Sequence, residues 1–301
     1  MKFVLFSFLL LVSCAQLKSK SYSESTDQYW SELVASSLAN KTSFLTTLKN
    51  TNPHLYNQIE NDSKDLKLIS FWGQSYNFDS GAKKQIIDDK IINELQAKFN
   101  ISNDNKIVHA GITHTYGYLF SVLNTPYGYK RKRWIDPTLN FAFAFSGNSL
   151  GPQTTEGGMF SNITYFAGSI AFKEIKDRKD LQALQNVSSE VKKFDYSKLE
   201  IQKVEEEIIQ NGVHGNILRT TLVKFPFKSE KEENDYLLIY SIWKPKLHKE
   251  ILITAFPIKK DAYKKLVDEE SLGANKGISV RYNAYLEGHM EQNLTGIKRL
   301  Y

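Results

Sequence analysis

The segment from Tyr236 to Trp243 reads Tyr-Leu-Leu-Ile-Tyr-Ser-Ile-Trp, and it indicates the fold class more strongly than any other stretch of the chain. Its first five residues, Tyr236 to Tyr240, are continuously apolar or aromatic, which is typical of a strand that is covered on both faces. Runs of strand-forming residues lie on either side of it in the chain, at about 216–225 and 250–258. The sequence therefore predicts a sheet in which residues 236–243 form a central strand.

The rest of the chain separates into helical and strand-rich regions. Helices are predicted at 26–38, 40–48, from Asn52-Pro53 onward, 81–99, 173–195 and 261–270. Further strands are predicted at about 66–72, 106–111, 116–123, 129–135, 139–145, 162–172 and 278–286. The clearest alternation is in 139–145, where Phe141, Phe143 and Phe145 place large aromatic rings on one face.

Because strands occur in runs and helices are grouped elsewhere, the pattern favours an α+β fold over a parallel βαβ sheet. We expect N-terminal helices packed on a largely antiparallel sheet rich in aromatics. Residues 26–301 are predicted to form a single domain, and the charged stretch 173–198 is the place where a second domain would begin. A hydrophobic content of 41% and an aromatic content of 13% are enough to build a large core.

The N-terminus carries a motif of its own. Met1 and Lys2 precede an apolar run from Phe3 to Val12, which is too short for a bilayer core of about 20 apolar residues. Leu-Val-Ser-Cys at 11–14 follows, and this segment resembles the lipobox of bacterial lipoproteins. The alternatives are an ordinary cleaved signal peptide and a short anchor helix.

The resemblance implies a signal peptide at 1–13, cleavage before Cys14 and acylation of its thiol and new amino terminus. Residues 14–25 are then a flexible tether that carries the lipid. Cys14 is the only cysteine of the 301 residues, so it has no partner for an internal disulfide. Ala15 follows it instead of Asp, which among such lipoproteins favours the outer membrane, with the domain facing the periplasm or the cell surface.

A basic run is the first candidate binding site. Lys130, Arg131, Lys132 and Arg133 are consecutive, and Trp134 follows them. Four cations cannot all be buried without partners, so this run is predicted to meet phosphate or carboxylate groups. The alternative is a charged edge strand whose lysines discourage aggregation.

A histidine-containing stretch is the second candidate. His114 follows His109 by five residues, a spacing that does not bring two imidazoles to one metal ion on a regular strand or helix, so no metal site is predicted. Each histidine is instead expected to be hydrogen-bonded near the end of the sheet. His114 would form an acid–base cluster with Asp136 and Glu156 if the hairpin and the glycine-rich loop 146–158 meet at one edge.

These observations predict a non-enzymatic lipid-anchored protein of the bacterial cell envelope that binds an anionic component, such as anionic lipid or lipopolysaccharide. The net charge of +6 agrees with that partner, although it is also explained by solubility alone. A lipid-anchored hydrolase of envelope material and a structural subunit of an envelope complex are the alternatives. No cofactor is predicted, and export makes nucleic acid an improbable partner.

Overall fold

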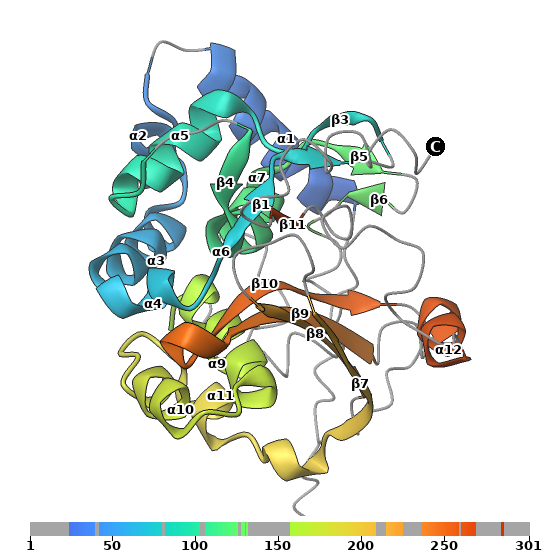
Figure 1. The fold of residues 1–301 in the computed structure, drawn as a ribbon. Coiled ribbons are helices and arrows are strands. Elements are labelled where there is room, and N and C mark those ends of the chain that lie inside the picture. The colour runs from blue at the N-terminus through green and yellow to red at the C-terminus, as the bar shows by residue number, and fades with distance from the viewer. Residues whose placement is uncertain are drawn as a thin grey trace, which may run out of the picture.

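The structure is a computed structural model, and it describes the chain in separate ranges. These are 24–39, 42–79, 82–102, 106–125, 128–129, 131, 157–208, 215–224, 236–258, 260–268 and 284–285. In Figure 1 the N-terminal helices and short strands form the upper part, and a four-stranded sheet crosses the lower part. Helices α9 (Met159–Ala171), α10 (Ile175–Gln182) and α11 (Ser189–Lys193) lie at the lower left of that sheet. The predicted α+β class is confirmed.

The four-stranded sheet is antiparallel throughout, in the order β10-β9-β8-β7. Its strands are β7 (Glu200–Ile208), β8 (Ile217–Lys224), β9 (Tyr236–Lys244) and β10 (Lys249–Ile258). The first seven residues of β9 are buried, as the continuous apolar run predicts for a central strand. Strand β7 was not predicted, because its four glutamates mask the alternation; charged side chains are common on edge strands.

Four helices begin the described chain. They are α1 (Glu24–Ala39), α2 (Phe44–Thr51), α3 (Pro53–Lys64) and α4 (Leu66–Ser70). The Asn52 side chain caps α3 by accepting from the backbone N–H of Leu55, and Pro53 takes the first helical position, where no N–H is needed. The strand predicted at 66–72 is wrong, because Asp65 caps a short helix there. Glu24 and Ser25, predicted as the end of the tether, belong to α1.

Short strands form the remaining sheets. Strand β1 (Gln74–Tyr76) pairs with β4 (Ile107–His109) on one side and β11 (Ala284–Tyr285) on the other. Two hairpins join β2 (Phe78–Asp79) to β3 (Lys84–Gln85) and β5 (Asn124–Thr125) to β6 (Gly128–Tyr129). The helix predicted from 81 begins later, because α5 spans Asp89–Lys98 and the side chain of Asp88 caps it.

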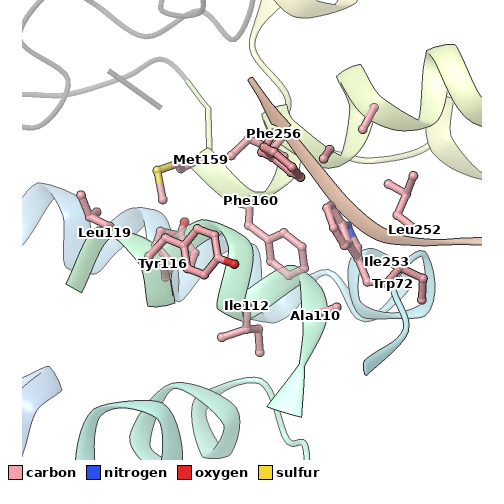
Figure 2. Close-up of a cluster of buried hydrophobic side chains, with 14 of the residues drawn as sticks. Trp72, Ala110, Ile112, Tyr116, Leu119, Met159, Phe160, Leu252, Ile253 and Phe256 are labelled. Atoms are coloured by element: carbon pink, nitrogen blue, oxygen red, sulfur yellow. The ribbon is translucent and has the colours of Figure 1, made fainter. Parts of the chain in front are cut away.

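Two segments predicted as strands are buried helices. Residues 110–120 form α6 (Ala110–Ile112), the π-helical turn η1 (Thr113–Gly117) and α7 (Tyr118–Phe120), and residues 162–171 belong to α9. Both segments are buried on nearly all sides, so they lack the one-sided apolar stripe that distinguishes a surface helix. Figure 2 shows Phe160 of α9 between Ile112 and Tyr116 on one side and Ile253 and Phe256 of β10 on the other.

One continuous apolar cluster extends from Trp30 in α1 to Tyr263 in α12 (Lys260–Asp268). The stretch 173–198 contributes Leu181, Leu184 and Val191 to that same cluster. The aromatic alternation predicted at 139–145 lies outside the described residues, as does Cys14. Within the described ranges, the helices are too short or too polar to cross a membrane.

Candidate functional site

Of the three residues predicted as an acid–base cluster, one lies within the described ranges. His114 lies in η1 with 1% of its surface exposed, and its Nδ1 is 2.7 Å from the carbonyl oxygen of Ala110. Its ring stacks against Trp72 and contacts Tyr118. Asp136 and Glu156 lie outside the described residues, so their approach to His114 stays a prediction.

His109 is likewise a buried, hydrogen-bonded residue. Its Nε2 lies 3.0 Å from the carbonyl oxygen of Ile69, and its Nδ1 accepts from the backbone N–H of Ile112 at the start of α6. Burial lowers the pKa of His109 to about 4, and the contact with Ile69 offsets this only in part. A neutral ring that donates from Nε2 and accepts at Nδ1 satisfies both contacts, as expected for a structural histidine.

Of the predicted basic run at 130–133 and the Trp134 that follows it, only Arg131 lies within the described ranges. Arg131 is fully buried, and its guanidinium donates to the carbonyl oxygen of Ser121 at 2.8 Å and to the hydroxyl of Ser31 at 3.2 Å. This cation therefore lies inside the protein, between α1 and the end of α7. Lys130, Lys132, Arg133 and Trp134 lie outside the described residues, and their role in anion binding stays a prediction.

A buried carboxylate missed by the sequence analysis organises the start of α9. Asp62 lies in α3, and four groups donate to its oxygens: the Tyr116 hydroxyl at 2.5 Å, the Ser161 hydroxyl, the Asn186 amide at 2.8 Å and the Phe160 backbone N–H at 3.2 Å. The donation from Phe160 makes Asp62 a long-range cap of α9, whose N-terminal N–H groups favour a negative charge.

The sequence contained a signal for this carboxylate. Asp62 follows Leu55 and Ile59 by seven and three residues, so it lies on the buried face of α3. Gly158 also fits the site, because a Cβ there would lie 2.0 Å from Asp62 Oδ1. Since Asp62, Tyr116 and Ser161 are fully buried, the carboxylate is assigned a role in the fold.

A second buried network joins the sheet to α10. Arg219 of β8 donates to Glu206 of β7 at 2.8 Å and also to Glu250 of β10. Ser241 of β9 donates to the same Glu250 carboxylate at 2.6 Å, and the Glu250 backbone N–H donates to Asp177 of α10 at 2.9 Å. Burial raises the pKa of Glu250, while Ser241 and Arg219 oppose that rise. The network fixes the start of β10 against the inner face of α10.

This fixed position brings two lysine-rich segments together at the surface. Helix α10 contributes Lys176, Arg178 and Lys179, and the turn between β9 and β10, which includes η4 (Pro245–Leu247), contributes Lys244, Lys246 and Lys249. Together with the exposed Ile175 and Leu247, these six cations are named the α10–turn surface. In Figure 1 it lies at the left end of the sheet.

The electrostatics of the α10–turn surface favour an anion. Burial lowers the pKa of Lys249; repulsion by Lys244 and Lys176 adds to this, while Asp177 opposes it. Asp177 is itself buried under the surface, and Asp180 pairs with Lys67 of α4 at 3.1 Å. An anionic group placed on this surface would therefore relieve repulsion among the lysines.

Comparison with protein-family models, with curated proteins and with solved structures finds no match to this chain. The described residues contain no cluster of three or more His, Cys, Asp or Glu side chains arranged to hold a metal ion.

Proposed function

We propose that the protein is a non-enzymatic, lipid-anchored component of the bacterial cell envelope, and that it binds an anionic envelope component through the α10–turn surface. The observation that carries the proposal is the hydrogen bond from the Glu250 N–H to Asp177, which holds the two lysine-rich segments against each other. Cations that the fold already holds close together bind an anion more tightly, because the repulsion between them has been overcome on folding.

The lipid anchor is the part of the proposal that rests on the sequence. A single cysteine directly after a short apolar leader has the chemistry of a lipid acceptor, since the thiol is the nucleophile that takes the acyl chain. Several acyl chains on one N-terminus give stable attachment at about 0.8 kcal/mol for each buried CH₂. An anchored domain then meets its anionic partner at high local concentration.

Replacing Cys14 tests the anchor. Cys14→Ser should abolish incorporation of labelled palmitate and leave the chain uncleaved, because the lipid precedes cleavage in the lipoproteins that the motif resembles. Ala15→Ser keeps the thiol and serves as the control that should still be labelled. If the Cys14→Ser protein incorporates the label, or if the native protein does not, the lipid anchor is refuted.

Matched charge variants test anion binding. The chain from residue 14 onward, with Cys14→Ser, is added to beads that carry phosphatidylglycerol, lipopolysaccharide or acidic wall polymer. The combined variant Lys176→Gln, Lys179→Gln and Lys246→Gln should bind at least about tenfold more weakly at about 0.1 M salt, since each lysine near an anionic surface contributes about 1 kcal/mol.

The control removes the same charge elsewhere. Lys49, Lys84 and Lys224 are exposed lysines in α2, β3 and the opposite end of β8. Their combined change to Gln should leave binding within about twofold of the parent, because surface charges separated by more than a Debye length of about 10 Å act weakly on each other. An equal loss of binding in both triple variants would show that the protein is attracted by its net charge alone. That result would refute binding at the α10–turn surface.

A further inference from the structure

The α10–turn surface includes two exposed apolar side chains as well as its cations. Ile175 is 67% exposed at the start of α10, and Leu247 is 64% exposed at the end of η4. Lys176 follows Ile175 directly, and Lys246 precedes Leu247. Single exposed apolar residues are common on protein surfaces, but here each one is adjacent in the chain to a lysine of the α10–turn surface.

The outer face of α10 combines the two properties. Ile175, Arg178, Lys179 and Gln182 follow the helical spacing of one face and line an open hollow of about 390 Å³. The opposite face carries the buried Asp177 and Leu181. The Arg178 guanidinium donates to the carbonyl oxygen of Lys173 at 2.6 Å, which holds it at the edge of this face.

We infer that the α10–turn surface docks on an anionic phospholipid bilayer, with its cations on the headgroup phosphates and with Ile175 and Leu247 entering the interface. This inference rests on the proposed function and names its partner. Charge complementarity favours the headgroups, and the apolar side chains favour a bilayer over a soluble polyanion. A polyanion would neutralise the lysines but would leave Ile175 and Leu247 in water.

The interior network makes this surface rigid enough to dock as a unit. Asp177 ties α10 to the start of β10, and Lys67 ties Asp180 to α4. The exposed Leu66, at 73%, precedes Lys67 at the start of α4. The backbone segments that carry the lysines therefore need little further ordering when the surface meets the headgroups, which favours binding.

Apolar variants separate bilayer insertion from attraction to charge. The chain from residue 14 onward, with Cys14→Ser, is sedimented with phosphatidylethanolamine vesicles that contain phosphatidylglycerol, and with neutral phosphatidylcholine vesicles. Ile175→Ser combined with Leu247→Ser should weaken binding to the anionic vesicles about tenfold, since interfacial affinity follows the buried apolar area. Binding to heparin beads, which carry a polyanion without any bilayer, should change less than twofold.

The matched control replaces exposed apolar residues elsewhere. Val122 and Ile201 are 47% and 52% exposed, and their combined change to Ser should leave vesicle binding unaltered. A thermal melt of each variant shows whether the fold is retained. If the Ile175 and Leu247 variant binds vesicles as the parent does, bilayer insertion is refuted.

A fluorescent label reports insertion directly. Since Cys14 is the only cysteine, Leu247→Cys in the Cys14→Ser background gives one labelling site, and Lys224→Cys gives a control at the opposite end of the sheet. A polarity-sensitive dye at 247 should shift to the blue on anionic vesicles, and a dye at 224 should not. Binding to beads with no shift at 247 would overturn the bilayer inference and leave the proposed function standing, whereas failure to bind any anionic probe would refute both.

Discussion

Asp177 and Glu250 connect the surface of the protein to its central sheet. Oδ2 of Asp177, in α10, accepts a hydrogen bond of 2.9 Å from the backbone N–H of Glu250, at the start of β10. Glu250 in turn receives the Arg219 guanidinium and the Ser241 hydroxyl, so one residue links α10 to three strands. The position of the α10–turn surface therefore depends on buried groups of the central sheet.

Removing the Asp177 carboxylate should loosen this connection. Asp177→Ala leaves the buried N–H of Glu250 without its acceptor, which costs about 1–3 kcal/mol in the free energy of unfolding. Urea denaturation measures the loss, and hydrogen exchange at the Glu250 amide should become faster. Asp180→Ala, which breaks only the exposed pair with Lys67, should cost less than about 1 kcal/mol. Equal losses for the two variants would contradict the assigned role.

Asp62 should be the carboxylate whose loss harms the fold most. Asp62→Ala leaves the donors of Tyr116, Ser161, Asn186 and Phe160 without an acceptor inside the protein, so we expect a loss of about 3 kcal/mol or more. The exposed Glu190 provides the control, and Glu190→Ala should change the free energy of unfolding by less than about 0.5 kcal/mol. A small effect at Asp62 would show that α9 does not need this cap.

The same carboxylate should make the stability depend on pH. Burial raises the pKa of Asp62 to about 6 in the folded protein, against about 3.9 for an unfolded chain. The folded state thus holds the proton more tightly, and this group adds stability as the pH falls through 6 towards 4. Linkage gives about 1.4 kcal/mol between pH 7.5 and pH 5. Asp62→Asn should remove that contribution from the urea-derived stability curve, and an unchanged curve would show that Asp62 does not titrate in this range.

The sequence predicted the sheet better than the interior helices, for a physical reason. In β9 the apolar run from Tyr236 to Tyr240 is confirmed as a buried strand, and the strands predicted before and after it in the chain are confirmed as β8 and β10. Residues 116–123 and 162–172 were predicted as strands from their apolar and aromatic side chains, but most of these residues form buried helices. Full burial removes the polar face, and without that face the periodicity of the side chains no longer separates helix from strand.

The candidate site shows the same limit. Lys244, Lys246 and Lys249 are close in sequence, but their neighbours Lys176 and Lys179 lie about 70 positions earlier. The folded contact between Asp177 and Glu250 brings the two segments together. The run at 130–133 was predicted to bind anions because its cations are consecutive. Its one described residue, Arg131, is buried against Ser121 and Ser31. The spacing of cations along the chain therefore does not show which of them the fold brings together.

His109 should affect the stability in the direction opposite to Asp62. Burial lowers the pKa of His109 to about 4, below the value of about 6.5 for an unfolded chain. The unfolded state then binds the proton more tightly, so this residue lowers stability as the pH falls through 6.5 towards 4. Between pH 7.5 and pH 5 the loss is about 2 kcal/mol, which exceeds the gain from Asp62. His109→Gln should be less stable than the parent at pH 7.5 but should lose less on acidification, as measured by urea denaturation at both pH values. A parallel loss in parent and variant would mean that the ring is protonated in the folded protein, which the contact of Ile112 N–H with Nδ1 opposes.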